Sequence, residues 1–307
     1  MGDFDVYTGN VDSAAGDITP VRLSSRAADM NKSPAWSPDG QWLAFVSQRG
    51  PFQEAGASRI VVRRMVDGTE REFVHDFQVI AARLAWSPDG RRLAFRDVQR
   101  GQSPSSAPIR LIDPMTGRVI ATMADPKPLP EGNRPLVDEF DWLDESTLAF
   151  TNQSGIGVID VGTGAWHMIW RPPAEHGFYR VAVSPDHRSV ATVMQPSDRS
   201  WFSAIVIPSS GGDARELLRV SRPEVMTLEC WTADGSSLLV TRHDRSKPQE
   251  EQREHMWRVP IDGGLATDLK LSGHGLQDIR AHPDGHQLAL VFGGGDNEFW
   301  TVSGFAK

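Results

Sequence analysis

The sequence predicts an all-β fold, a six-bladed β-propeller with four-stranded antiparallel blades. Three observations predict it. One short sequence motif recurs six times along the 307 residues, its period is that of a propeller blade, and no segment carries the apolar periodicity of a long helix.

The repeat is clearest in its first two copies. Trp-Ser-Pro-Asp-Gly at residues 36–40, followed by Leu-Ala-Phe at residues 43–45, returns at residues 86–90 and 93–95. With the weaker copies, blade signatures lie near residues 34–47, 84–95, 140–150, 181–192, 230–240 and 280–291. The tryptophan position recurs at residues 36, 86, 142, 183, 231 and 281, a mean interval of 49 residues. A period of about 40–50 residues built from short apolar runs is typical of propeller blades.

Each signature is expected to form the hairpin between the first and second strands of a blade. Proline fixes φ, the aspartate side chain bonds nearby backbone, and glycine accepts a positive φ. The repeated aspartates are therefore interpreted as turn formers rather than as a carboxylate array, and the repeated tryptophans as packing between blades. These aspartates are Asp39, Asp89, Asp186, Asp234 and Asp284. Third strands are expected at residues 59–63, 109–112, 157–160, 204–207 and 256–259.

Closure of the sixth blade requires both ends of the chain. Only 26 residues follow Ala281, too few for the rest of a blade. We expect an N-terminal strand around residues 21–23 to complete the blade that begins at Gln277, which would leave no exposed sheet edge between the ends. Residues 5–9 and 299–302 compete for the third-strand place. Residues 1–307 are expected to form a single domain.

The repeat resembles that of the TolB-type propeller family, on the residues Trp-Ser-Pro-Asp-Gly and Leu-Ala-Phe quoted above. Similar repeats occur in the N-terminal propellers of prolyl-oligopeptidase-like and tricorn-type proteases. The pattern departs at residues 143–144 and at residues 281–282, where other residues replace Ser-Pro and Trp-Ser. We expect the separate N-terminal domain of TolB and the hydrolase domain of the peptidases to have no counterpart here. The resemblance implies a bare binding propeller from a bacterial, extracytoplasmic setting.

Composition and missing motifs exclude several classes of protein. The net charge of −8 argues against nucleic-acid binding, and no apolar run is long enough for a membrane helix. A single cysteine, Cys230, excludes an intrachain disulfide and a cysteine-based metal cluster. Neither Gly-x-Ser-x-Gly nor His-Glu-x-x-His occurs. We therefore expect no cofactor, no resident metal and no catalytic motif, in a monomeric protein.

The innermost strand of each blade is expected to line a central channel. Alternate residues of a strand share a side, so the residues one and three places before the tryptophan position should face the channel. The expected channel residues are Arg83, Glu139, Asp141, Arg180, Asp278 and Arg280, and the expected rim residues are His176, Tyr179 and His274. Buried charges must pair or meet water or a ligand. A water-filled, mutually neutralised channel and a pocket for a polar small molecule or peptide terminus both remain open.

Function is predicted from the same pattern. Repeats cover the chain and catalytic motifs are missing, which favours a non-catalytic propeller that binds a protein, a peptide or a small polar ligand at the channel and rim. The alternative is a channel-mouth enzyme, a lyase, glycosidase or metal-assisted hydrolase using clustered carboxylates and histidines. Its candidate residues are Glu139, Asp141, His176, Tyr179, His243 and His274. A third possibility is a scaffold separated from its partner domain.

Overall fold

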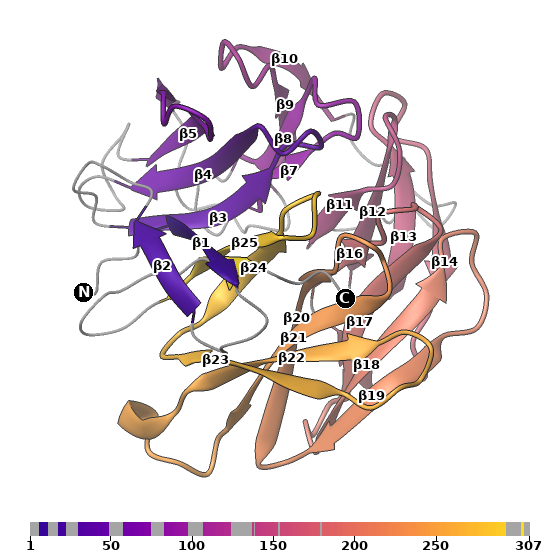
Figure 1. The fold of residues 1–307 in the computed structure, drawn as a ribbon. Helices are drawn as coiled ribbons and strands as arrows, with labels where there is room; N and C mark the ends of the chain where they lie inside the picture. Colours follow the sequence, from indigo (N-terminus) through magenta and orange to yellow (C-terminus); the bar gives the residue numbers. More distant parts are fainter. Residues whose placement is uncertain are drawn as a thin grey trace. The chain divides into compact units, whose positions relative to one another are not determined.

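Antiparallel strands make up nearly all the regular structure of the computed structural model. It describes residues 6–11, 18–22, 30–48, 58–74, 83–97, 107–123, 137, 139–152, 154–178, 180–292 and 302–303. The fold is an all-β propeller of four-stranded antiparallel blades (Figure 1). Contacts divide the chain into a first unit, residues 1–123 with 274–307, and a second unit, residues 124–273. Each unit is described by itself below.

The first unit contains two blades and a composite sheet. One blade runs β3 (Met30–Trp36), β4 (Trp42–Gln48), β5 (Ser58–Arg64) and β6 (Glu70–Val74). The next runs β7 (Ala85–Trp86), β8 (Leu93–Arg96), β9 (Ile109–Ile112) and β10 (Val119–Thr122). The composite sheet joins β1 (Val6–Val11), β2 (Ile18–Arg22), β24 (Gln277–Ala281), β25 (Gln287–Val291) and β26 (Val302–Ser303).

The second unit contains three blades. The first has β11 (Phe140–Trp142), β12 (Thr147–Asn152), β13 (Gly155–Asp160) and β14 (Trp166–Trp170). The second has β15 (His176–Phe178), β16 (Ala182–Val183), β17 (Ser189–Pro196), β18 (Trp201–Pro208) and β19 (Arg215–Ser221). The third has β20 (Glu224–Trp231), β21 (Ser237–Asp244), a 3-10 helix η2 (Gln249–Glu251), β22 (Glu254–Pro260) and β23 (Thr267–Gly273).

The blade count differs from the prediction. Five blades are built from strands that follow one another in the chain, and each of the five predicted third strands lies within one of them. The structure thus shows five blades of this kind, not six. The reason is that the signature at residues 280–291 supplies only β24 and β25, and the other strands of its sheet come from the ends of the described chain.

The two ends of the chain meet in the composite sheet. β1 pairs with β25 from Val6 opposite Val291 to Asn10 opposite Gln287, and β2 lies beyond β1. Figure 1 shows the indigo β1 beside the yellow β25. The predicted pairing of an N-terminal strand with the last repeat is present, and β2 includes residues 21–22 of the expected closing strand. β26 also pairs with β25. Of the candidate at residues 299–302 only Val302 belongs to β26, and residues 299–301 lie outside the described residues.

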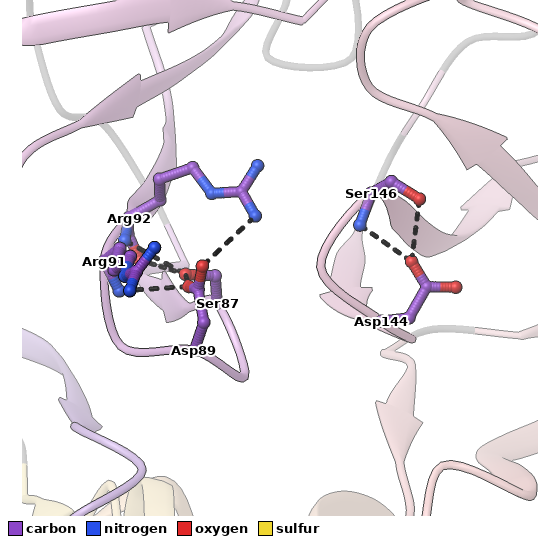
Figure 2. A network of polar contacts seen from close by, with 6 residues as sticks. All are labelled: Ser87, Asp89, Arg91, Arg92, Asp144 and Ser146. Atoms are coloured by element: carbon purple, nitrogen blue, oxygen red, sulfur yellow. Dashed lines mark hydrogen bonds and ion pairs between the residues drawn. The ribbon is translucent and has the colours of Figure 1, made fainter.

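The repeated aspartates organise turns, as predicted. In the second repeat, Ser87 Oγ donates to Asp89 Oδ1 (2.5 Å), which also accepts from Arg91 N (3.0 Å). Figure 2 shows this turn and the turn of Asp144, whose Oδ1 accepts from Ser146 N (2.7 Å). Equivalent bonds to the backbone two residues on are made by Asp39, Asp186, Asp234 and Asp284. Because these carboxylates are engaged in their own turns, they form no shared array.

The repeated tryptophans join neighbouring sheets within each unit. In three of them the indole Nε1 donates to the carbonyl oxygen of the residue just before the tryptophan position of another repeat. That repeat is the preceding one for Trp86 and Trp231, and the last one of the chain for Trp36. The pairs are Trp36 with Arg280 (3.2 Å), Trp86 with Ala35 (3.0 Å) and Trp231 with Ala182 (3.0 Å). Each of these indoles is also largely buried. The predicted packing role therefore includes a directional bond that fixes one sheet against the next.

One repeat uses a different device, because Val183 stands at the tryptophan position. There the preceding inner strand carries Asp141, whose Oδ2 accepts a hydrogen bond from Val183 N (3.1 Å). Its other oxygen accepts from Trp142 N (3.0 Å). A carboxylate side chain thus makes the contact between sheets that an indole makes elsewhere.

No helix in the described part of the chain is both long enough and apolar enough to cross a membrane.

Candidate functional site

Bulges in the innermost strands decide which predicted residues come together. The register between first and second strands shifts between Lys32 and Ala35 in β3, between Leu228 and Cys230 in β20, and between Gln277 and Arg280 in β24. A bulge inserts an extra residue and turns the following side chains. In these three strands strict alternation therefore fails two or three places before the tryptophan position. Of the predicted channel residues, Asp278 and Arg280 lie in one of them.

At the bulge of β20 lies Glu229, the most important residue that the sequence prediction left out of the candidate site. Alternation assigned Leu228 and Cys230 to the channel side, but both are buried, at 1% and 8% exposure. Glu229 between them instead forms an ion pair with Arg180 of the neighbouring blade, with Nη1 and Oε2 at 2.6 Å. A charged residue inside an apolar strand was the available signal, since a buried charge needs a partner.

Threonines of the second strands fix this part of the inner strands. Thr241 Oγ1 donates to Glu229 Oε1 (3.0 Å), and Thr192 Oγ1 donates to the carbonyl oxygen of Arg180 (2.7 Å). In the first blade of this unit, Thr151 Oγ1 accepts from Glu139 N (3.2 Å). Each threonine lies twelve residues after its partner, a spacing visible in the sequence. We name Glu139, Arg180, Glu229 and their three threonines the inner-strand cluster.

The inner-strand cluster lies on three neighbouring blades of one unit. β11 is in contact with β16, and β16 with β20. Arg180 and Glu229 are therefore joined across two blades, and Glu139 occupies the corresponding place on the third. Of the predicted residues, Glu139 and Arg180 belong to this cluster. Both oxygens of Asp141 instead accept backbone hydrogen bonds, one from Trp142 N of its own strand and one from Val183 N of the neighbouring blade. An acid–base role for Asp141 is thus opposed by its structural bonds.

Two of the three predicted rim residues lie in the described part of the chain, one in each unit. His176 lies in β15, where Nδ1 is 2.8 Å from Ala174 O and the ring lies 5.4 Å from that of Trp201. The guanidinium of Arg219 lies over the same indole at 3.9 Å. His274 is half-buried in the turn after β23, in the other unit. Tyr179 lies outside the described residues.

The last blade of the second unit carries a further charged group. The guanidinium of Arg242 pairs with Glu224 and lies 4.1 Å from the centroid of Trp257. His243 Nδ1 and Glu254 Oε1 are 4.0 Å apart, and burial lowers the pKa of His243 although Glu254 opposes this. Arg242 Nε and Glu254 Oε2 are buried without a hydrogen-bond partner. His243 was a candidate of the channel-mouth enzyme, and the sequence also places Glu224 and Arg242 on loops that border the expected channel.

Three of the predicted channel residues, Arg83, Asp278 and Arg280, lie in the first unit. Arg280 Nη1 donates to Ile279 O (2.7 Å), and its own carbonyl oxygen accepts from Trp36. Asp278, with φ +52°, lies at the bulge of β24 and raises the pKa of Lys32, which burial lowers more strongly. Arg83 is half-buried, just before β7. Across the described ranges, no three or more His, Cys, Asp or Glu side chains are grouped so as to hold a metal ion.

Sequence comparisons identify a partial relative. No family model matches the chain. The Tol-Pal system protein TolB of Alcanivorax borkumensis is 44% identical over 62 residues, which are 20% of this chain and 13% of TolB. The chain thus matches about an eighth of the length of that relative. The match supports a propeller family, in agreement with the observed blades.

Solved structures share the fold at low sequence identity. Kuenenia stuttgartiensis hydrazine synthase superposes with a TM-score of 0.56 at 17% identity, over 84% of this chain and 72% of that one. An oligogalacturonate lyase in complex with manganese gives a TM-score of 0.56 at 13% identity, over 89% and 79%. At such identities the likeness shows the fold alone, since propellers support many unrelated functions.

Proposed function

We propose that this chain is a non-catalytic binding propeller that engages a protein, a peptide or a small polar ligand at its inner strands and their rim. The observation that carries the proposal is the inner-strand cluster, in which Arg180 of one blade is held by Glu229 of the next. Both residues are further bonded to threonines, so the polar groups are oriented before any ligand arrives. Such preorganisation lowers the cost of binding.

The finer architecture belongs to the same proposal. We place the composite sheet as a sixth blade that closes a ring in one domain of 1–307, with β1 and β2 completing the repeat of β24 and β25. The inner strands would then surround a central channel, and the inner-strand cluster would face it. The TolB-type repeat and the partial match to TolB support this arrangement and a bacterial, extracytoplasmic setting. We propose in addition that the protein is a monomer.

Capture of ligands by variant proteins tests the binding function. Immobilised wild-type chain and Arg180→Ala are incubated with the same bacterial lysate, and bound proteins and metabolites are quantified by mass spectrometry. We expect Arg180→Ala to capture at least about tenfold less of each ligand that is specific to the wild type, because an arginine in a binding site can carry a large share of the binding free energy. Arg64→Ala, at an exposed turn of the first unit, is the control that should retain them.

Two results would contradict a binding role at the inner strands. One is equal capture by the wild type, Arg180→Ala and Arg64→Ala. The other is turnover in a screen of glycan substrates, with stoichiometric metal in the purified protein and loss of activity in Glu139→Gln. That second result would support the channel-mouth enzyme instead.

A further inference from the structure

We infer that His282 forms a proton-dependent contact, the His282 clasp, which holds the last repeat of the chain against the first. The clasp regulates the closure of the fold and does not depend on the proposed binding function. Its basis is the set of atoms around the two ring nitrogens of His282, and the residue type that stands at the corresponding place in other repeats.

His282 occupies a place that a hydroxyl residue holds in four other repeats. There the residue just after the tryptophan position donates from its side-chain oxygen to the aspartate two residues further on, at 2.5–2.6 Å. The donors are Ser37, Ser87, Ser184 and Thr232. In the last repeat His282 Nδ1 lies 2.7 Å from Asp284 Oδ1, so the histidine ring keeps the contact with the turn aspartate.

The longer side chain of His282 also reaches the first repeat. Its Nε2 lies 3.0 Å from the carbonyl oxygen of Gly40, and its ring meets that of Trp36 edge to face, with centroids 4.6 Å apart. Gly40 leaves room for the ring, because a Cβ added at this residue would collide with it. His282 therefore connects the turn between β24 and β25 to the turn between β3 and β4.

A doubly protonated ring satisfies both of these oxygen atoms. Carbonyl and carboxylate oxygens accept hydrogen bonds, whereas a neutral imidazole carries a single N–H. If neutral His282 donates from Nε2 to Gly40, Nδ1 accepts from Asp284 N at 3.1 Å, but its lone pair then also faces Asp284 Oδ1. If it donates from Nδ1, the lone pair of Nε2 faces the carbonyl oxygen. The imidazolium donates to both, and Asp284 N, in an exposed turn, then bonds water. A proton on His282 thus strengthens the clasp.

The carboxylate in contact with the ring is ionised while histidine titrates. Burial acts to raise the pKa of Asp284, but hydrogen bonds from His286 N and from His282, with the charges of both histidines, outweigh it and hold the pKa below its ordinary value. Histidine changes its charge between about pH 5 and pH 8. The other charged neighbours are Asp39, which adjoins Gly40, and Arg280, which precedes the ring in β24. The anion nearest to Nδ1 is therefore present over the whole range.

Hydrogen exchange of two indole groups measures the clasp in the full chain. Trp36 Nε1 donates to the carbonyl oxygen of Arg280 in the last repeat, so its exchange reports separation of the two sheets. Trp86 Nε1 makes the equivalent bond to Ala35, where Ser37 stands at the place of His282. Exchange is followed by nuclear magnetic resonance at about pH 5.5 and about pH 8, and each rate is divided by that of free tryptophan at the same pH.

The two indoles should respond differently to pH. We expect protection of Trp36 to be about tenfold greater at the lower pH, the effect of one charge-assisted hydrogen bond, and protection of Trp86 to be unchanged. The 15N shifts of the His282 ring report its protonation directly. Both nitrogens should carry a proton at about pH 5.5, and only one at about pH 8.

Variants make the test specific. His282→Ser restores the hydroxyl residue of other repeats without the contact to Gly40, so protection of Trp36 should no longer depend on pH. His286→Ser, in the same turn, is the matched control and should keep the tenfold difference, because its contact with Asp284 comes from the backbone. The wild-type measurements decide the question even if His282→Ser folds poorly.

Three outcomes would overturn the clasp. They are equal protection of Trp36 at both pH values, an equal rise for Trp36 and Trp86, and a pH dependence of Trp36 that persists in His282→Ser. The second outcome would show a change of the whole protein rather than of one contact. Ligand capture that depends on Arg180 is measured separately, so the clasp and the binding function stand or fall independently.

Discussion

A single carboxylate organises each hairpin turn at the scale of residues. For Asp89, burial acts to raise the pKa, but hydrogen bonds from Ser87 and Arg91 and the charge of Arg92 outweigh it and hold the pKa below its ordinary value. The pKa of Asp186 is likewise lowered, above all by the Ser184 hydroxyl. Lowered pKa values also mark Asp144, Asp234 and Asp284. These shifts stabilise the ionised form of the folded protein.

Acid should therefore unfold the protein through its turns. A carboxyl group whose folded pKa lies below its unfolded pKa stabilises the fold above the unfolded value, and the contribution disappears as the pH falls through the folded value. We expect the urea midpoint to be level from about pH 7 to about pH 5 and to fall steeply below about pH 4.

Replacing the aspartates of two turns should make the loss of stability in acid less steep. The slope of stability against pH depends on how many more protons the unfolded state binds than the folded state. In the double variant Asp89→Asn with Asp234→Asn, each substitution lowers this difference by up to about one proton. The measurement is the free energy of unfolding in urea against pH. An unchanged slope below pH 4 would show that the turn carboxylates do not control acid stability.

Close packing around one strand governs stability at the scale of elements. Gly157 lies in β13, where an added Cβ would come within 2.7 Å of the Phe150 ring and 2.9 Å of His167 O. Gly177 lies in β15, where an added Cβ would meet nothing within 4 Å. The two glycines form a matched pair, since neither has the positive φ that strains an alanine.

Alanine at these two positions should have opposite effects. Gly157→Ala should lower the free energy of unfolding by about 1–3 kcal/mol through overpacking. Gly177→Ala should be neutral or raise it by about 0.4–1 kcal/mol, because it restricts the unfolded chain. Urea unfolding measures both. Equal effects would mean that β13 tolerates a methyl group and that the packing described here is wrong.

The hairpins and third strands were predicted correctly from the sequence, whereas the bulges were not. Turn chemistry and alternation predicted the hairpins and the third strands, because both depend on neighbours in the chain. The bulges in β3, β20 and β24 were missed. A bulge is fixed by contacts between blades, such as that of Glu229 with Arg180, and these residues are far apart in sequence.

The pairing of the two chain ends acts at the scale of the whole molecule. Val6 is fully buried and packs in one cluster with Trp36 and Ala289, and β1 covers the edge of β25. A terminal strand that pairs with the last repeat connects the start of the chain to its end. Without it, a long apolar edge would be left for other chains to pair with.

Removal of residues 1–22 should therefore reduce stability and solubility. Loss of the buried Val6 side chain alone removes about 1.5–3 kcal/mol, and the ladder of β1 is lost as well. We expect a lower thermal midpoint and aggregation on size-exclusion chromatography. A synthetic peptide of residues 1–22 added in trans should restore both. A truncated protein that melts like the full chain would contradict this role of β1 and β2.

The sequence by itself determined the repeats, their turns and the all-β class, because these follow from apolar alternation and from residues a few places apart. It also identified Arg180 as a polar inner-strand residue. Only the tertiary structure decided that Glu229 pairs with Arg180, that five repeats rather than six form blades from consecutive strands, and that Asp141 accepts hydrogen bonds from the backbone. Such contacts join segments that are tens to hundreds of residues apart in the chain, so the pattern of neighbouring residues does not predict them.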